Sequence, residues 1–334
     1  MSIYFHDYDK LYPELVIEIL EYFEISNATD GKPNDKSIRK FCAKNNFKYQ
    51  PVPINRICKR LCECNHMDIV RSGGFLDLDS NYVVIIKDKA LFESQRNQLS
   101  FYFNSVVYGF EYIYRIYKDL VVPLVWEREN GEYSAGTGFK FKDGIVTAKH
   151  CVTDVTNLQI KGYKAEDLEG KPIYISENEG VDLAFIETGK ISTPILLAEE
   201  GEIMQEVIVM GYPKIPAFTQ FLTAEKATIS SKASSRITPT KGAIAAYGYE
   251  YLSKIDAMLI TARIRGGNSG GPIINQNGCL VGVACHIPDA NPENGDYDDM
   301  GYGVAIPVSY LLDLIDKKSK QLPTHHNFFK DFIE

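Results

Sequence analysis

The stretch that most limits how this chain can fold runs from residue 265 to 272, with the sequence Arg-Gly-Gly-Asn-Ser-Gly-Gly-Pro. Glycine lets the backbone turn without a steric penalty, so main-chain N–H groups can face inward. The N–H groups of Gly267 and Ser269 can then point to one place beside the Ser269 hydroxyl. That arrangement predicts an oxyanion hole next to a nucleophile. The alternative is a tight glycine turn between two strands.

A serine nucleophile needs a base that takes its proton during attack. His150 follows a short apolar run at residues 145–148. The imidazole in turn needs a carboxylate to hold its tautomer, and Asp182 stands at the start of the apolar run 183–186. Asp154 and Asp256 are alternatives for this third member, although neither precedes such a strand. His150, Asp182 and Ser269 together predict a catalytic triad.

The segments around these three residues resemble the catalytic blocks of the trypsin-like serine proteases. They are residues 147–151, 182–184 and 267–272, in the chain order His, Asp, Ser that chymotrypsin-like enzymes use. Residues 136–139 and 301–307 resemble two further strands, the latter typical of HtrA-type members. The resemblance covers residues 121–318. It implies an all-β, chymotrypsin-like double β-barrel of two six-stranded barrels, at about 121–195 and 200–310.

The resemblance also implies an endopeptidase without a PDZ domain that forms an acyl-enzyme and needs no cofactor or metal. A protein or peptide would be its substrate. It further implies which residues line the substrate pocket, namely Arg263, Cys285, His286, Gly301 and Gly303. Arg263 stands where trypsins that cleave after Lys or Arg carry Asp, so no basic preference is expected. Arg263 or His286 would favour an acidic side chain, whereas a small or aliphatic side chain is the default expectation.

The pattern of residues 1–88 predicts a separate α+β domain, with winged-helix-like topology, before the protease-like segment. Helices are predicted at residues 14–23, 36–45 and 53–65, followed by a β-hairpin over residues 67–86, an order that resembles a winged-helix domain. Residues 31–71 carry ten Lys and Arg against three acidic residues, which DNA phosphates would attract. The third helix holds Arg56, Lys59 and Arg60. A protein-docking face is the favoured interpretation over DNA binding, since a fold does not fix a function.

Residues 89–120 predict a helical connector that is rich in aromatic side chains, with a break near Gly109. Apolar residues lie on more than one face of this helix. That pattern indicates a buried helix, or a contact with a protein activator or a second copy of the chain. Residues 319–334 are expected to form a C-terminal tail.

Composition bears on the cellular context. The formal net charge is −8, so the chain as a whole has no attraction to nucleic acid. No signal-peptide pattern is visible at the start, and no apolar run reaches the ~20 residues of a membrane helix. The seven cysteines are therefore expected to be reduced thiols in the cytoplasm. A zinc site at Cys58, Cys62, Cys64 and His66 is not expected, because the spacing lacks separated ligand pairs.

These patterns predict a multidomain, intracellular serine endopeptidase that its N-terminal domain regulates or targets. Two alternatives belong to other classes of protein. One is a DNA-binding regulator that carries a protease domain. The other is a catalytically silent, protease-like interaction module.

Overall fold

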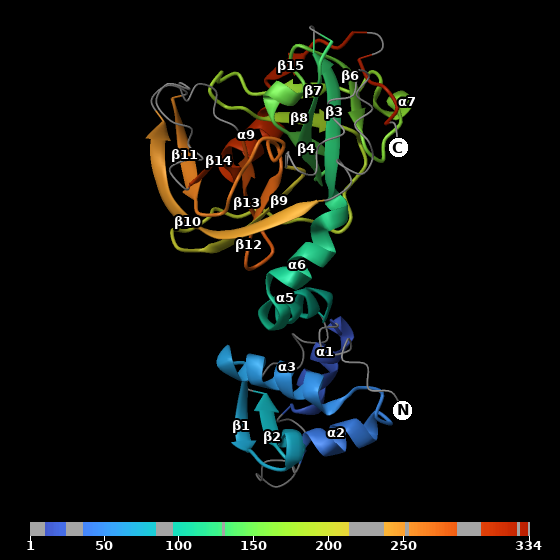
Figure 1. Ribbon diagram of the computed structural model, residues 1–334, viewed down its shortest axis with the longest axis vertical. Helices are drawn as coiled ribbons and strands as arrows, with labels where there is room; N and C mark the ends of the chain where they lie inside the picture. The colour runs from blue at the N-terminus through green and yellow to red at the C-terminus, as the bar shows by residue number, and fades with distance from the viewer. Residues whose placement is uncertain are drawn as a thin grey trace. The chain divides into compact units, whose positions relative to one another are not determined.

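The computed structural model describes residues 11–24, 36–84, 96–128, 131–213, 237–250, 254–285, 302–325 and 328–332. The chain consists of two compact units, Met1–Ile113 and Tyr114–Glu334, whose elements are labelled in Figure 1. The boundary between the units falls inside helix α6 (Phe110–Tyr117). It therefore lies within the stretch expected to be a connector, and residues 319–334 belong to the second unit.

The first unit contains the three predicted helices and the predicted pair of antiparallel strands. Helices α1 (Pro13–Tyr22), α2 (Ile38–Lys44) and α3 (Pro51–Glu63) precede strands β1 (Met67–Arg71) and β2 (Asn81–Val84). Helix α3 begins two residues earlier than expected, because proline is well tolerated in the first turn of a helix. Ser37 caps α2, since its side chain accepts a hydrogen bond from the Lys40 N–H. The winged-helix resemblance stays a prediction.

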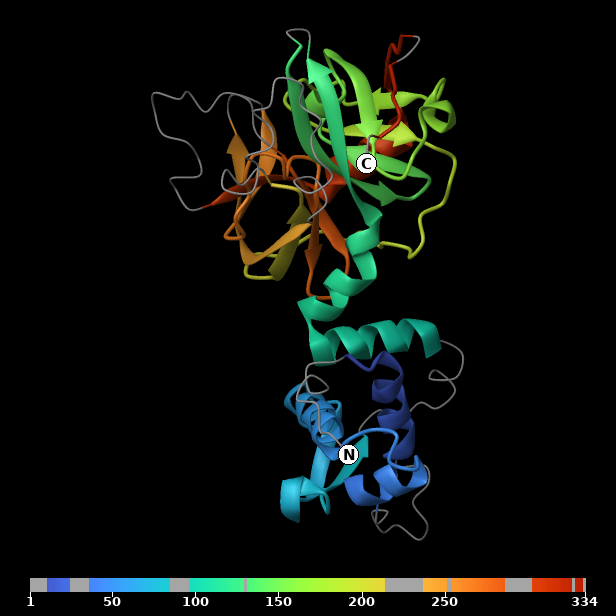
Figure 2. The ribbon, with the colours of Figure 1, turned by 45° about the vertical axis from the view of Figure 1, so that its right-hand side comes forward.

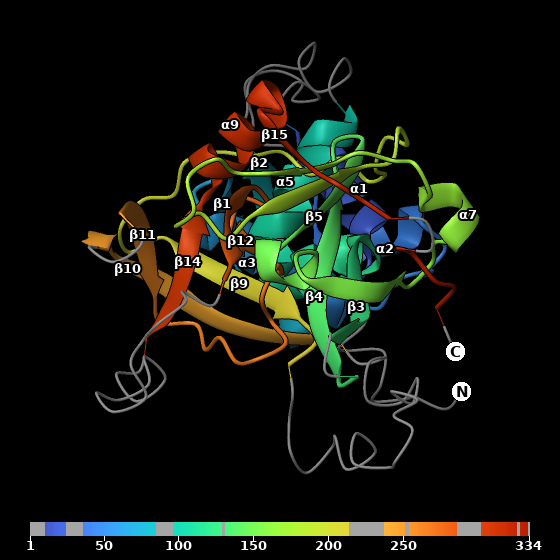
Figure 3. The same cartoon turned by 90° about the horizontal axis from the view of Figure 1, so that it is seen from above.

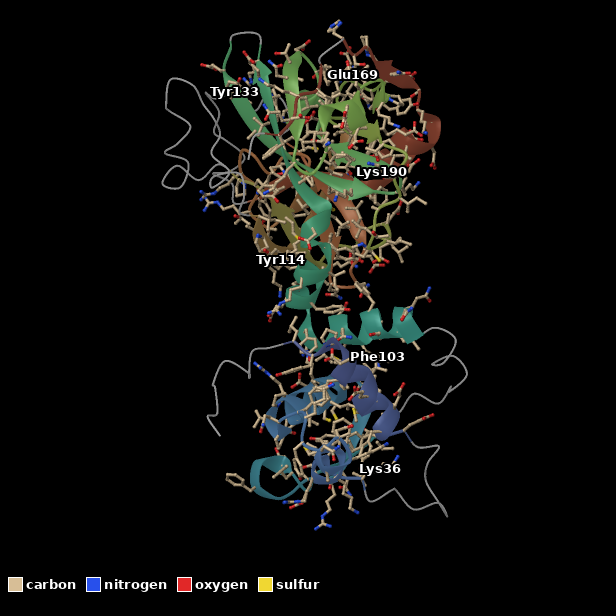
Figure 4. The ribbon with its side chains drawn as sticks, turned by 90° about the vertical axis from the view of Figure 1, so that its right-hand side faces the viewer. Lys36, Phe103, Tyr114, Tyr133, Glu169 and Lys190 are labelled. Atoms are coloured by element: carbon tan, nitrogen blue, oxygen red, sulfur yellow. The ribbon has the colours of Figure 1, made fainter. Side chains whose placement is uncertain are left out.

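The aromatic stretch forms two helices with the predicted break between them. Helix α5 (Arg96–Tyr108) and helix α6 are separated by Gly109, whose φ is +59°, a conformation that glycine adopts readily. Helix α5 packs against α1 and α3 (Figure 2). Its Phe103, labelled in Figure 4, is 1% exposed and belongs to the core of the first unit. Part of the aromatic content therefore serves ordinary packing.

The second unit begins with a seven-stranded antiparallel sheet in the order β15-β7-β8-β5-β4-β3-β6. Its strands are β3 (Val121–Arg128), β4 (Tyr133–Phe141), β5 (Gly144–Thr147), β6 (Val155–Ile160), β7 (Ile173–Ile175), β8 (Ala184–Glu187) and β15 (Lys320–Leu322). Between these strands lie the short helices η5 (Lys149–Cys151) and α7 (Ala165–Leu168). The sheet thus takes six strands from one continuous segment and the seventh from the C-terminal residues.

A closed barrel follows the sheet, with the strand order β10-β11-β14-β13-β12-β9. Its strands are β9 (Glu206–Gly211), β10 (Thr238–Glu250), β11 (Ile255–Ile260), β12 (Pro272–Asn275), β13 (Leu280–Ala284) and β14 (Gly303–Pro307). Helix α9 (Val308–Lys317) then leads to β15. The predicted second barrel is confirmed.

The first half differs from the expected six-stranded barrel, because the C-terminal residues enter it. Strand β15 pairs with β7, and Phe329 forms a bridge to Leu158 on β6 at the other end of the strand order. In Figure 3 this segment is drawn in red and runs across the sheet toward α7, where the Asp331 carboxylate accepts a hydrogen bond from the Ala165 N–H. Residues 320–322 are therefore a strand of the sheet, and Phe329 extends its other edge by one bridge.

Two further observations bear on the expected membrane and redox properties. None of the helices within the described ranges is both long and apolar enough to cross a membrane. All seven cysteines fall in those ranges, and each is a free thiol.

Candidate active site

The two strands that carry His150 and Asp182 are neighbours in the sheet. Strand β5 ends at Thr147, which is paired with Ala184 at the start of β8. The residues just after β5 and just before β8 therefore meet at one edge. There the His150 Nδ1 lies 2.7 Å from the Asp182 Oδ2, and the His150 main-chain N–H donates to Oδ1 at 2.9 Å. Asp182 holds both the ring and the backbone of His150.

The burial of the two side chains is unequal. Asp182 is buried, whereas the His150 side chain is 42% exposed. Burial lowers the pKa of His150, but hydrogen bonds to Asp182 and Cys151 and the negative charges of these two groups outweigh that effect, so the pKa rises from 6.5 to about 10. Asp182 thus favours the imidazolium, the form that a general base reaches once it has accepted a proton.

The alternative carboxylates do not make this contact. Asp154 is exposed and lies just after the turn that contains His150. Asp256 is exposed on β11, where its main-chain N–H donates to the Tyr310 hydroxyl at 3.0 Å. Asp182 is the carboxylate that the fold brings to His150.

The turn that carries Ser269 depends on glycines with left-handed backbone. Gly267 has φ +97° and Gly270 has φ +85°, values at which other residues are strained. The Gly270 N–H donates to the Ala284 carbonyl at 2.6 Å, and the Ala284 N–H donates to the Gly271 carbonyl at 2.8 Å. These bonds fix the turn to the end of β13. Ser269 itself is 5% exposed.

The two N–H groups predicted to form an oxyanion hole have no acceptor. Among the residues that the structure describes, neither the Gly267 nor the Ser269 N–H donates a hydrogen bond. Buried main-chain donors are nearly always paired, so two free ones beside a serine are what an oxyanion site needs. Within the same residues no hydrogen bond joins His150 to Ser269. Catalytic hydrogen bonds often tighten only when substrate is bound.

The predicted pocket residues are only partly brought together. Arg263 is exposed, and its carbonyl accepts a hydrogen bond from the Thr240 hydroxyl. The Cys285 side chain is 2% exposed, and its Sγ donates to the Asp182 carbonyl at 3.2 Å. Burial, followed by the charge of Asp182, raises the pKa of the Cys285 thiol. Cys285 could therefore line a pocket through its backbone alone. His286 and Gly301 lie outside the described residues.

Ile264 packs against one of the predicted pocket residues, a contact that the sequence interpretation missed. A Cβ placed on Gly303 would lie 2.8 Å from the Ile264 Cγ1, so the Ile264 side chain packs directly against the bare backbone of Gly303. The available signal was an apolar residue between the two charged residues Arg263 and Arg265. No group of three or more His, Cys, Asp or Glu side chains in the described parts of the chain could hold a metal ion.

Comparison with protein families gives one match, to the trypsin-like peptidase domain, over residues 136–283. This range contains His150, Asp182 and Ser269. Residues 136–283 are thus similar to a trypsin-like peptidase domain. The matched part of the chain is 148 residues long, from the second half of β4 to β13.

Curated relatives of the trypsin-like peptidase domain are HtrA/DegP-like serine proteases. The chain is 26% identical over 204 residues to "Protease Do-like 2, chloroplastic" of Arabidopsis thaliana, which covers 59% of this chain and 30% of that protein. It is 28% identical over 193 residues to "Probable periplasmic serine endoprotease DegP-like" of Pseudomonas fulva, which covers 57% and 36%. The chain thus spans about a third of the length of these relatives.

Solved structures with the same kind of domain also match. One is the active form of the Rv3671c protease from M. tuberculosis, at 20% identity and a TM-score of 0.46, over 64% of this chain and 86% of that one. Another is the serine endoprotease from Yersinia pestis, at 21% identity and a TM-score of 0.42, over 62% and 65%. The relatives' names include chloroplastic and periplasmic proteins, so the cytoplasmic location stays a prediction.

Proposed function

We propose that this protein is a serine endopeptidase in which Ser269, His150 and Asp182 act as the catalytic triad. The observation that carries the proposal is the pair of hydrogen bonds that Asp182 accepts from the Nδ1 and the main-chain N–H of His150, at 2.7 and 2.9 Å. The pair lies in the segment that matches the trypsin-like peptidase domain, together with Ser269. Among the described residues, the N–H groups of Ser269 and Gly267 donate no hydrogen bond. The hydrogen bonds to Asp182 fix the tautomer of the base, and the two N–H groups provide a place for the oxyanion.

The reaction then follows from what each group can accept or donate. The Nδ1 of His150 is engaged by Asp182, so Nε2 takes the Ser269 proton as the Oγ bonds to the substrate carbonyl carbon. The N–H groups of Gly267 and Ser269 stabilise the negative oxygen. His150 gives its proton to the leaving amine as the C–N bond breaks. A water molecule, deprotonated by His150, then cleaves the acyl-enzyme and regenerates the Ser269 hydroxyl.

The substrate side chain next to the cleaved bond is expected to be small or aliphatic. Ile264 packs against Gly303, and neither residue offers a charge or a hydrogen-bonding side chain. Arg263, which would favour an acidic side chain, is exposed. An apolar wall discriminates between side chains by size, since each methylene is worth about 1–3 kcal/mol. Proteins and peptides with aliphatic residues at this position are therefore the proposed substrates.

The first unit is proposed to regulate or target the peptidase through a protein contact. Two of the three basic residues on α3 are already in ion pairs, Lys59 with Asp77 at 2.8 Å and Arg60 with Glu63 at 2.9 Å. Such pairing reduces the charge available for phosphates. DNA binding would be recognised by a steep loss of affinity as salt increases. If the protein binds DNA only weakly and without that salt dependence, the result supports a protein partner.

A fluorophosphonate probe tests the proposed activity directly, because it reacts only with an activated serine. Purified full-length protein is compared with Ser269→Ala, His150→Ala and, as a matched control, His325→Ala, which removes an exposed histidine outside the site. We expect labelling of the wild type and of His325→Ala, and none of the other two variants. A wild type that unfolds cooperatively but does not label would favour the catalytically silent module instead.

A further inference from the structure

Thr137 is a fully buried residue of β4 whose polar atoms reach the turn of the nucleophile. It is 0% exposed. Its main-chain N–H donates to the Ser269 carbonyl at 3.0 Å, and its hydroxyl donates to the Gly267 carbonyl at 2.6 Å. Thr137 and Gly267 are 130 residues apart in the chain. A residue of the sheet thus holds two carbonyl groups of a turn that belongs to the barrel.

The direction of the Thr137 hydroxyl proton is fixed by a second hydrogen bond. The Tyr212 main-chain N–H donates to the same oxygen at 2.9 Å. A hydroxyl has one proton to donate. The Tyr212 N–H can only donate and the Gly267 carbonyl can only accept, so the hydroxyl proton points to the Gly267 carbonyl. The Thr137 hydroxyl therefore constrains the turn in one direction.

This constraint acts on the peptide unit between the two free N–H groups. The carbonyl of the Gly267–Asn268 peptide is held by Thr137, and its N–H donates to the Arg265 carbonyl at 2.9 Å. The peptide is thus fixed at both ends. If it rotated, the Gly267 and Ser269 N–H groups on either side would lose their common direction. Glycine at 267 permits such a rotation, so another residue must prevent it.

The side-chain oxygen inside the turn does not supply this restraint. Asn268 is 1% exposed, and within the part of the chain that the structure describes its Oδ1 has no hydrogen-bond partner. Its surroundings are crowded, since a Cβ on Gly211 would lie 2.7 Å from the Asn268 Oδ1 and 3.0 Å from the Thr137 Oγ1. The Thr137 hydroxyl is accordingly the side-chain donor that this turn uses.

We propose that Thr137 is a positioning residue for the oxyanion hole. By donating to the Gly267 carbonyl it sets the orientation in which the Gly267 and Ser269 N–H groups converge. Thr137 itself touches no substrate atom in this scheme and acts through the turn. The inference rests on the proposed serine peptidase function, which it deepens.

The test compares Thr137→Val, which keeps the shape but removes the hydroxyl, with Thr137→Ser, which keeps the hydroxyl. The matched control is Thr188→Val. Thr188 is also buried, and its hydroxyl likewise donates to a carbonyl, that of Asp143, and accepts from an N–H, that of Lys190. It therefore loses an equivalent pair of hydrogen bonds outside the active site. The reaction of full-length protein with a fluorophosphonate is followed to obtain the maximal rate and the half-saturating concentration.

We expect Thr137→Val to lower the maximal labelling rate about 10- to 100-fold, which is less than the about 10²- to 10³-fold loss on removing an oxyanion-hole donor itself, because both N–H groups remain. The half-saturating concentration should stay unchanged, because only the transition state is affected. Thr137→Ser should stay within about threefold of the wild type. Thr188→Val should lose thermal stability but keep its labelling rate. Equal labelling by Thr137→Val and the wild type would overturn the proposal.

A readout that needs no activity separates this inference from the proposed function. Crystal structures of the wild type and Thr137→Val are compared at the Gly267–Asn268 peptide. We expect the peptide to rotate in the variant and its carbonyl to leave the Thr137 position. A wild type without labelling would refute the proposed function, and the peptide would still decide the role of Thr137. An unrotated peptide in Thr137→Val would overturn the inference.

Discussion

The sheet that holds His150 and Asp182 and the barrel that holds Ser269 end their strand ladders in different ways. In the barrel the ring is complete, since β9 pairs with both β10 and β12. In the sheet, strands β7 and β6 are covered by residues from the far end of the chain, through β15 and Phe329. An unpaired strand edge is a liability. The sheet beside the base therefore depends on a distant segment to cover its edges, whereas the barrel beside the nucleophile closes its own strand ladder.

The largest effect should come from the carboxylate on the sheet side of the site. Asp182→Asn should reduce the rate of fluorophosphonate labelling about 10⁴-fold, because an amide stabilises the wrong imidazole tautomer. Asp256→Asn, which changes an exposed carboxylate on barrel strand β11, should stay within about twofold. Similar losses in both variants would mean that Asp182 has no specific role at His150.

The pH dependence of labelling should be the next largest effect, because only neutral imidazole can accept the serine proton. Against the effect of burial, Asp182 and Cys151 together raise the pKa of His150 to about 10. The labelling rate should therefore rise about tenfold per pH unit below that pKa, with a midpoint above 6.5. Asp182→Asn removes the hydrogen bond and the negative charge of Asp182, both of which raise the pKa of His150, so the midpoint should move to lower pH. A wild-type midpoint below 6.5 would contradict this account.

A smaller effect tests the dependence of the sheet on the C-terminal segment. Phe329 is 6% exposed where it bridges to β6, and Phe329→Ala should cost about 3 kcal/mol of unfolding free energy. Met204→Ala, at a site 79% exposed just before the barrel, should change it by less than about 0.5 kcal/mol. Urea unfolding measures both. If Phe329→Ala were as stable as the wild type, the sheet would not need the segment.

The smallest effect concerns the ion pair at the start of that segment. The Lys318 Nζ lies 2.6 Å from the Glu187 Oε1 on β8, and this hydrogen bond lowers the pKa of Glu187 below 4.5. Its contribution to stability is present above pH 4.5 and is lost as the pH falls through the lowered pKa. Glu187→Gln should cost less than about 1 kcal/mol at neutral pH.

The matched variant for this ion pair lies on the barrel. Glu206 pairs with Lys241 at 2.7 Å, and both side chains are about half exposed. Glu206→Gln should change the unfolding free energy by even less, because solvent screens the pair. Thermal unfolding between about pH 3 and about pH 7 compares the two. Equal acid sensitivity in both variants would remove this difference between sheet and barrel.

The sequence alone determined the elements whose chemistry is local. The helices of the first unit, the break at Gly109 and the strands around His150 and Ser269 follow from proline, glycine and apolar patterns within a few residues. Gly267 and Gly270 carry their own explanation, because glycine accepts their left-handed backbone angles without strain. The pairing of His150 with Asp182 was also predictable, since each residue adjoins an apolar run that must be a buried strand.

The tertiary structure decided what depends on segments far apart in the chain. It placed residues 320–322 and Phe329 on the sheet, Cys285 against the Asp182 carbonyl and Ile264 against Gly303. It also brought Thr137 to Gly267, across 130 residues of sequence. Nothing near Thr137 in the sequence indicates this contact, because a buried hydroxyl takes its partner from whichever backbone the packing leaves beside it. Thr137 meets Gly267 because the barrel packs against the sheet at this point.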